Sequence, residues 1–162
     1  MTQVKKGNIG ERIVDDYFQG QGYIIYKPVQ DAPHLIDRFY VKDKKQLIFA
    51  EVKTKAKRNK YPDTGFDNRH YEEYKTLQEM GLIVWIFFVD EAEGAVYGNT
   101  LEKLSIPRTI QHRGQTIEYP KRWGEIIYFP REIMDNIYLL TKEEVMEIKS
   151  YNTRNYGYEI HS

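Results

Sequence analysis

The sequence predicts an α/β fold in which helices flank a mixed central β-sheet, with an α+β extension at the C-terminal end. Three observations predict it: an amphipathic helical repeat near the N-terminus, two β-rich runs joined by a short polar turn, and a continuous apolar run at residues 82–89. An apolar run without alternation is typical of a strand covered on both faces. We expect a single domain over residues 1–162, with a core at about 6–104 and the extension at about 105–162.

The first element is a helix that we expect to begin at Asn8, a residue type that caps helix N-termini, and to end at Gly20. Its apolar side chains recur at helical spacing; they are Ile9, Ile13, Val14, Tyr17 and Phe18. Glu11 lies at the edge of this apolar stripe and has two interpretations. It either bonds back to Asn8 as the third residue of the helix, or reaches a functional site on the sheet.

Two paired strands follow a short strand at residues 23–26. The runs 34–41 and 46–54 are rich in β-branched and aromatic residues. The polar turn Asp43-Lys44-Lys45 lies between them. This order of runs and turn predicts an antiparallel hairpin.

Charged side chains on this hairpin mark the candidate functional site. Residues i and i+2 of a strand share a face, so Glu51 and Lys53 should point the same way as Phe49. Charges on an otherwise apolar face are costly unless they are compensated, and Asp37 on the neighbouring strand can supply a second carboxylate. Two carboxylates can hold a divalent cation that activates a water molecule, while a lysine stabilises the developing negative charge. The pattern therefore indicates metal-dependent hydrolysis of phosphodiester bonds.

Two short motifs resemble one nuclease superfamily. Asp37, followed after thirteen residues by Glu51-Val52-Lys53, resembles the PD-(D/E)xK nuclease signature. The stretch from Lys6 to Arg12 resembles the start of the first helix in the archaeal-type Holliday junction resolvases of that superfamily. The resemblance covers residues 6–89, about half the chain. Ile36 stands where the family usually has proline, and residues 28–35 contain no serine of the kind expected in junction resolvases.

This resemblance implies a restriction-endonuclease-like core and a DNA endonuclease that uses Mg²⁺, with Mn²⁺ as a substitute. It implies a catalytic set of four side chains, namely Glu11, Asp37, Glu51 and Lys53. Within that set, Asp37 and Glu51 would hold the metal together with the Val52 carbonyl. Polar residues on the second helix are accessory candidates, namely Tyr71 and Gln78. Resolvases of this type are dimeric, which implies a homodimer here.

The remaining elements follow from local patterns. A second helix is expected at residues 66–80, so that a crossover joins the hairpin to the central strand at 82–89. The second half should contain four shorter elements: an edge strand at 95–98, a short helix at 100–104, and strands at 117–119 and 125–129. Thr141 and Glu144 form a capping box that should start a helix at residues 142–149.

The densest basic cluster directly follows the candidate active strand. It comprises Lys55, Lys57, Arg58 and Lys60 and runs into residues 61–65, whose composition predicts a loop. Such a run is either a solvated surface or a loop that grips phosphates. The whole chain has 24 basic and 24 acidic side chains. This neutral balance argues against strong non-specific DNA binding, so any affinity must come from local patches.

Composition excludes several classes of protein. The chain has no cysteine, which excludes disulfides and disfavours a structural zinc site. No apolar run approaches the length of a membrane span, and the first residues contain no signal-peptide core. We therefore expect a cytoplasmic protein with DNA as its partner and no membrane. Two alternatives stay open: a catalytically inactive nuclease-fold module that binds nucleic acid or a protein, and cleavage of RNA.

Overall fold

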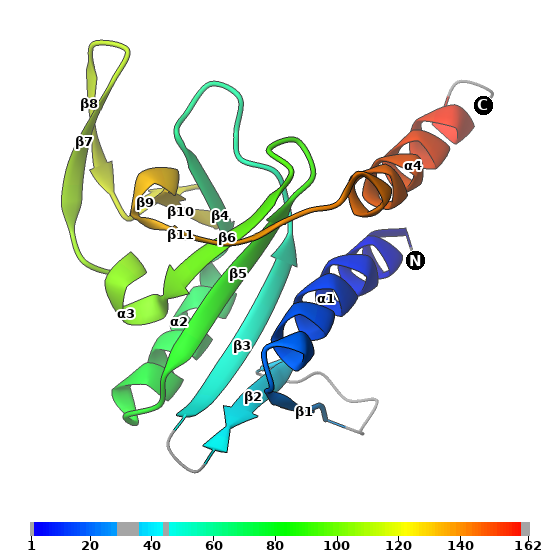
Figure 1. The fold of residues 1–162 in the computed structure, drawn as a ribbon. Coiled ribbons are helices and arrows are strands. Elements are labelled where there is room, and N and C mark those ends of the chain that lie inside the picture. Colours follow the sequence, from blue (N-terminus) through cyan, green and yellow to red (C-terminus); the bar gives the residue numbers. More distant parts are fainter. Residues whose placement is uncertain (1, 29–35, 44–45, 160–162) are drawn as a thin grey trace.

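The computed structural model describes residues 2–28, 36–43 and 46–159. Its centre is a six-stranded mixed sheet in the order β1-β2-β3-β5-β6-β11 (Figure 1). These strands are β1 (Ile24–Tyr26), β2 (Arg38–Lys42), β3 (Gln46–Thr54), β5 (Val84–Asp90), β6 (Ala95–Thr100) and β11 (Asp135–Leu139). Neighbours run antiparallel except β3 and β5, which are parallel. The structure confirms the predicted fold class. Residues 34 and 35 of the predicted hairpin and Lys44 and Lys45 of its turn lie outside the described residues.

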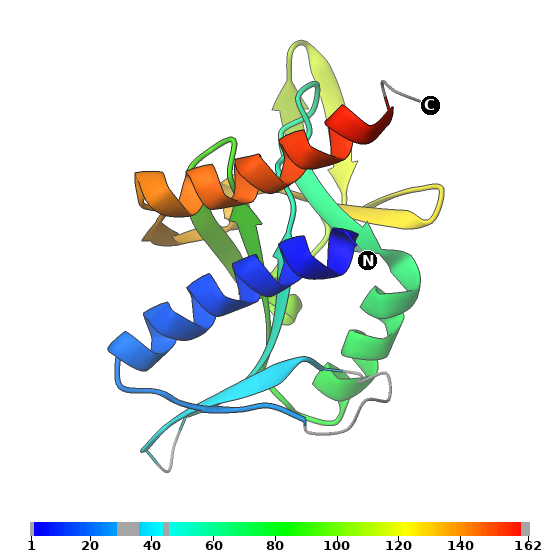
Figure 2. The same cartoon turned by 90° about the vertical axis from the view of Figure 1, so that its right-hand side faces the viewer.

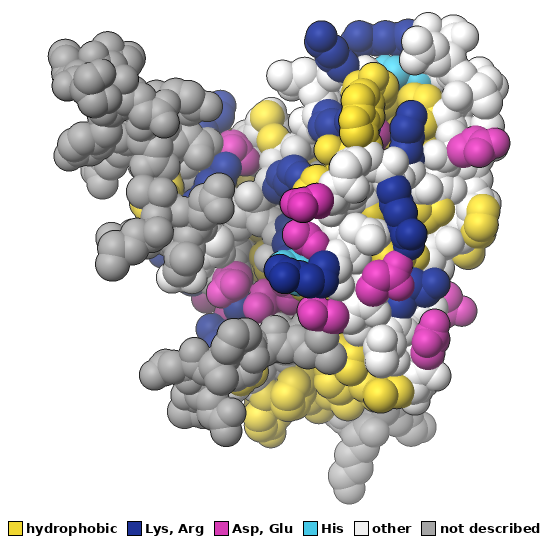
Figure 3. All heavy atoms as spheres, turned by 180° about the vertical axis from the view of Figure 1, so that it is seen from behind, with side chains coloured by type: hydrophobic (Ala, Val, Ile, Leu, Met, Phe, Trp, Pro, Cys, Tyr) yellow, Lys and Arg dark blue, Asp and Glu magenta, His cyan; other side chains and the backbone are white. Residues whose placement is uncertain are grey.

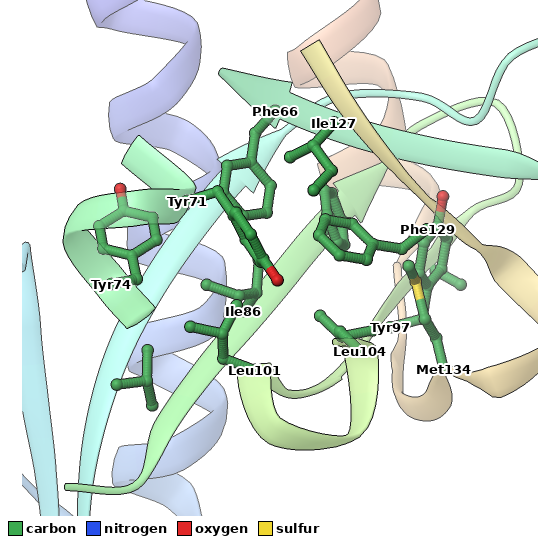
Figure 4. Close-up of a cluster of buried hydrophobic side chains, with 13 residues drawn as sticks. Phe66, Tyr71, Tyr74, Ile86, Tyr97, Leu101, Leu104, Ile127, Phe129 and Met134 are labelled. Carbon is green, nitrogen blue, oxygen red and sulfur yellow. The ribbon is translucent and has the colours of Figure 1, made fainter. Parts of the chain in front are cut away.

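Helices cover the two faces of this sheet separately. α1 (Thr2–Gly20) and α4 (Lys142–Glu159) lie along one face, and α2 (Asn68–Glu79) lies on the other (Figure 1 and Figure 2). Each face has its own hydrophobic core, because side chains alternate between the faces along every strand. The core under α1 is built on β2, β3, β5 and β6, and the core under α2 also contains side chains from the second half of the chain (Figure 4).

The first helix begins earlier than its local pattern predicts. It starts at Thr2, so the expected cap Asn8 lies inside it, and Glu11 is not the third helical residue. Tertiary contacts explain the difference. Lys6 pairs with the nearly buried Glu91 at 3.0 Å, and a Cβ added at Gly10 would lie 1.9 Å from the Thr54 hydroxyl oxygen. The glycine therefore lets α1 approach β3 closely.

Two predictions from local pattern are wrong for a shared reason. Residues 61–65 were expected to be a loop, but β4 (Asp63–Asp67) begins there because it pairs with β10 (Ile126–Pro130). β6 was expected to be an edge strand, but β11 pairs along its outer side. Both differences arise from partners that lie far along the chain, which a local pattern does not reveal.

The extension supplies several small elements around the core. A three-stranded sheet has the order β4-β10-β9, with β9 at Lys121–Trp123. β7 (Arg108–His112) and β8 (Gln115–Tyr119) form a separate hairpin. α3 (Leu101–Leu104) starts at the cap Thr100, which confirms the predicted short helix, and η2 (Arg131–Ile133) precedes β11.

The last helix confirms the predicted capping box. The Glu144 amide donates to the Thr141 hydroxyl at 3.1 Å, and the Thr141 amide donates to the Glu144 carboxylate at 2.8 Å. The helix then continues to Glu159, beyond its expected end at residue 149. Among the described residues, no helix has the length and apolarity needed to cross a membrane.

Candidate active site

The β2–β3 hairpin brings Asp37 next to Glu51. Arg38 lies opposite Ala50 in the antiparallel register, so the preceding Asp37 comes opposite Glu51. Ala50 and Arg38 face α1, where Arg38 bonds to Asp15. Because faces alternate along a strand, Asp37 and Glu51 point to the opposite side of the sheet.

Glu51, Lys53 and Tyr74 contact one another between β3 and α2. The Lys53 ammonium lies 2.8 Å from a Glu51 carboxylate oxygen and 3.3 Å from the Tyr74 hydroxyl. Glu51 is only 6% exposed, so its charge depends on these partners. The ammonium also lies 5.6 Å from the centre of the Phe66 ring. The predicted common face of Glu51 and Lys53 is confirmed.

The neighbouring Glu51 affects the ionisation of Asp37. Burial, and then the negative charge of Glu51, raise the pKa of Asp37 from 3.8 to about 6. A hydrogen bond between the two carboxyls adds to the rise, while the positive charges of Arg38 and Lys53 oppose it. Such coupling is typical of like charges that share one site. A proton or a cation between the carboxylates relieves the repulsion.

These donors fit a small divalent cation. Mg²⁺ prefers oxygen ligands and is usually held by one or two carboxylates together with substrate phosphates and water. Asp37 and Glu51 supply that minimal set. Within residues 2–28, 36–43 and 46–159, no group of three His, Cys, Asp or Glu side chains is arranged to hold an ion. Val52, the implied source of a carbonyl ligand, lies between Glu51 and Lys53, in the segment of β3 that pairs with β5.

Glu11 is connected to this site through Arg38. Its carboxylate pairs with the Arg38 guanidinium at 2.6 Å, and Asp15 binds the same guanidinium at 2.6 Å. Tyr40 donates a further hydrogen bond to Asp15 at 2.8 Å. Arg38 is only 3% exposed and directly follows Asp37. The two α1 carboxylates therefore hold the start of β2, and with it the backbone of Asp37.

The four candidate basic residues differ in their surroundings. Arg58 forms two hydrogen bonds to the fully buried Asp63 at 2.6 and 2.7 Å, and its guanidinium stacks on Tyr128 at 3.7 Å. Tyr119 donates a third hydrogen bond to Asp63 at 2.6 Å. Arg58 thus ties the loop after β3 to the extension. Its guanidinium therefore stabilises the fold, in addition to its predicted contact with DNA.

Lys55 lies near both Arg58 and Lys53. Its ammonium donates to the Gly65 carbonyl at 3.0 Å, and burial, followed by the charge of Arg58, lowers its pKa. Lys57 and Lys60 are exposed. The basic run therefore contains a half-buried cation next to the active strand and two exposed cations further along.

The second helix presents Tyr74, rather than the accessory candidates, to Lys53. The Tyr71 hydroxyl donates to Ser105 at 3.0 Å, in the core on the side of α3. Figure 4 shows the Tyr74 hydroxyl at the margin of that core, pointing away from Leu101. Gln78 lies near the end of α2, where it lines a shallow pocket. The sequence analysis did not name Tyr74, and the available signal for its polar role was a phenol hydroxyl on the apolar side of the second helix.

Comparisons with known proteins support the fold. The structure of Hjc, a Holliday junction resolvase from the archaeal hyperthermophile Archaeoglobus fulgidus, superimposes with a TM-score of 0.52 at 11% sequence identity. The match covers 78% of this chain and 90% of the Hjc chain. At this identity the likeness concerns the fold. No family model and no curated protein matches the sequence.

Proposed function

We propose that this protein is a metal-dependent endonuclease that hydrolyses phosphodiester bonds in DNA. The observation that carries the proposal is the coupled pair Asp37 and Glu51, with Lys53 at 2.8 Å from Glu51. Two carboxylates and a lysine at the ends of adjacent strands suit phosphoryl chemistry better than a structural core. The fold shared with Hjc, whose name describes a junction resolvase, makes branched DNA the first substrate to test.

The metal would be held by Asp37, Glu51 and the Val52 carbonyl, with Mg²⁺ as the natural ion and Mn²⁺ as a substitute. When bound, such an ion activates a water molecule and offsets negative charge on the phosphate. The two carboxylates would otherwise repel each other, so their own electrostatics favour a cation at this place.

Lys53 would act on the reacting phosphate directly. An ammonium has three N–H donors, and in the described part of the chain Glu51 and Tyr74 accept two of them. The third is free to donate to the attacking water or to a phosphate oxygen as negative charge develops. Tyr74 would be a positioning residue, because its hydroxyl restrains the ammonium.

Glu11 would be a second positioning residue. Its ion pair with Arg38 fixes the chain beside Asp37, so it would complete the site without touching substrate. DNA would lie along the basic run that leaves β3, with phosphate contacts from Lys55, Lys57, Arg58 and Lys60. Two cuts on opposite strands require two active sites, for which a homodimer is the simplest arrangement.

A cleavage panel tests the proposal. Linear duplex, single-stranded, flap and four-way-junction DNA, with RNA alongside, should be incubated with Mg²⁺, Mn²⁺ or EDTA. We expect metal-dependent cleavage of DNA by the wild type and none by Glu51→Gln. The exposed Asp16 gives a matched control, since Asp16→Asn removes a carboxylate from α1 and should cleave normally. Cleavage by Glu51→Gln at the wild-type rate would exclude the two-carboxylate site.

A catalytically inactive binding module is the second candidate. The Glu51–Lys53 ion pair favours it, because the lysine partly balances a buried carboxylate without any cation. The two candidates differ in the thermal midpoint, which a ligand specific for the folded state raises. An unchanged midpoint with Mg²⁺ and Mn²⁺, together with no cleavage of any substrate, would favour the binding module.

A further inference from the structure

An exposed tryptophan lies on the outer face of the small β4-β10-β9 sheet. Trp123 is 55% exposed, and Lys121 shares its face of β9 because the two are separated by one residue. Tyr128 lies opposite Lys121 in the antiparallel register and so belongs to the same face. The other face of this sheet points into the core through Ile127 and Phe129. Trp123 is the exposed ring of this face, while Tyr128 is half-buried against the cluster of Ile110, Ile117 and Tyr119.

Cations surround these rings. The Arg58 guanidinium lies between Tyr61 at 4.2 Å and Tyr128 at 3.7 Å, and is 5.8 Å from the centre of the Trp123 ring. Lys121 lies 5.8 Å from Trp123, and Lys55 lies 5.9 Å from Tyr128. Tyr61 and Trp123 meet edge to face at 6.2 Å. We call these six residues the aromatic–basic surface: Lys55, Arg58, Tyr61, Lys121, Trp123 and Tyr128. In Figure 3, Lys and Arg side chains gather around hydrophobic ones at the upper right, over strands of the extension.

Lys55 links the candidate active site to the aromatic–basic surface around β4, because Lys53 lies against Phe66 on the core face of the small sheet and Lys55 lies against Tyr128 on the other face. Glu51 and Lys53 point to the side of the sheet that faces α2, and Lys55 directly follows the end of β3 at Thr54. Phe66 of β4 lies 5.6 Å from the Lys53 ammonium. The adjacent Gly65 accepts the hydrogen bond from Lys55. A ligand bound at Lys53 would pass Lys55 at the edge strand β4 to reach Arg58 and Trp123.

The hairpin that carries Trp123 is anchored on its opposite side. Arg122 points away from Trp123 and pairs with Glu72 of α2 at 2.6 Å. On the other face of the small sheet, the fully buried Asp63 binds both Arg58 and Tyr119. The ring is thus presented on a braced strand, and a rigid aromatic group loses little conformational entropy when it stacks on a ligand.

We propose that the aromatic–basic surface binds an unpaired nucleotide of the DNA substrate, whose base stacks on Trp123 while its phosphates meet Lys55, Arg58 and Lys121. In taking the ligand to be DNA, this inference rests on the proposed function. It deepens that function by assigning DNA with a single-stranded segment beside the cleaved bond as the preferred substrate class. Bases in an intact duplex are stacked on each other, whereas an unpaired base exposes a ring face that can stack on an aromatic side chain.

The two tryptophans of the chain allow a direct test. Trp85 is half-buried and stacked on Phe87 at 5.4 Å, so Trp85→Phe leaves Trp123 as the reporter, and Trp123→Phe leaves Trp85. Fluorescence is measured in EDTA, which prevents cleavage, with a duplex that carries a single-stranded overhang. We expect the overhang to quench Trp85→Phe protein and to leave Trp123→Phe protein unchanged. A blunt duplex and an overhang made of abasic nucleotides should quench neither protein.

Affinity measurements complete the test. Trp123→Ala should weaken binding of the overhang duplex on the order of tenfold and change binding of the blunt duplex less than twofold, while Trp123→Tyr should restore most of the loss. Equal quenching by the abasic overhang, or an unchanged affinity in Trp123→Ala, would overturn the inference. The proposed nuclease function fails separately. If binding depends on Trp123 but the wild type cleaves nothing in Mg²⁺, the nuclease function is rejected and the stacking site is kept. If the wild type cleaves DNA but binding does not depend on Trp123, the stacking site is rejected and the nuclease function is kept.

Discussion

Arg38 donates to Glu11 across 2.6 Å, and this ion pair lies on the face of β2 opposite to the one that Asp37 presents to Glu51. The two faces of β2 therefore have different roles. One face is held by α1, and the other carries the candidate chemistry. The division gives Glu11 a role that can be separated from metal binding.

We predict that Glu11→Gln lowers the free energy of unfolding by about 1–2 kcal/mol, since it weakens a charged hydrogen bond while Asp15 still holds Arg38. Mg²⁺ affinity, measured by calorimetry, should stay close to the wild-type value. Asp16→Asn serves as the control for loss of a carboxylate on α1. If Glu11→Gln lost metal affinity as completely as Asp37→Asn, Glu11 would be a ligand instead.

Asp37→Asn should separate metal binding from folding. The substitution removes one of two repelling carboxylates, so the metal-free variant should be at least as stable as the wild type. It should no longer gain stability when Mg²⁺ or Mn²⁺ is added, and cleavage should be lost. Scanning calorimetry with and without the cation measures both effects. A variant that binds the cation as tightly as wild type would disprove the role of Asp37.

The pH dependence of stability follows from the same carboxyl group. Its pKa is about 6 in the folded protein and 3.8 without these surroundings, so the folded state holds more protons between those two values. Stability contributed by this group therefore falls as the pH rises through that window and is lost above it. Without metal, the free energy of unfolding of Asp37→Asn, relative to that of the wild type, should rise on the order of 2 kcal/mol between pH 4 and pH 7. Denaturant unfolding of both proteins at four pH values measures this difference. The same difference in free energy of unfolding at every pH would contradict the prediction.

Lys53→Ala should keep the fold but lose some stability, because the nearly buried Glu51 loses its cation. It should lose cleavage by at least about 100-fold, the size of effect expected when a donor to developing negative charge is removed. Metal affinity should persist, because Asp37 and Glu51 remain. The Lys53 charge also lowers the pKa of Asp37, so that pKa should rise further in the variant. Tyr74→Phe is the matched comparison. It removes only the hydroxyl that restrains the Lys53 ammonium, so the cleavage rate should fall less. A Lys53→Ala protein that cuts at the wild-type rate would refute the role of Lys53.

The basic run should divide into structural and DNA-binding members. Neutralising the exposed Lys57 and Lys60 should leave the fold intact and flatten the salt dependence of DNA binding by roughly one unit of slope per lost phosphate contact. Arg58→Gln should instead destabilise the fold by about 3–5 kcal/mol, since it leaves the buried Asp63 without its cation. Adding Lys55→Gln to the double variant should reduce the slope further. An unchanged slope would mean that the run is only a solvated surface.

We predict a homodimer in solution. One chain of this size has limited surface with which to hold a duplex, and cutting both strands requires two sites. Sedimentation at micromolar concentration, with and without junction DNA, measures the oligomeric state. A monomer under both conditions would contradict the prediction.

The sequence by itself determined the parts of this protein that depend on local periodicity. The two-residue repeat of β3 put Glu51 and Lys53 on one face, and the structure holds them 2.8 Å apart. The uniformly apolar segment that became β5 indicated the buried strand beside β3. Thr141 and Glu144 marked a helix start by their spacing alone. In each case the interaction that determines the structure joins residues that are close together in the sequence.

Only the tertiary structure decided which groups meet across long stretches of sequence. Whether Tyr71 or Tyr74 reaches Lys53 depends on the rotation of α2 against the sheet, since both side chains are buried in the same core. In the sequence, Arg58 is one member of a basic run. In the structure, the pairing of β10 with β4 places Tyr128 against its guanidinium. The sequence left Glu11 as either a helix cap or a site residue, and the structure pairs it with Arg38. Burying a charge requires a partner for that charge, and here the partner is supplied by the packing of distant segments.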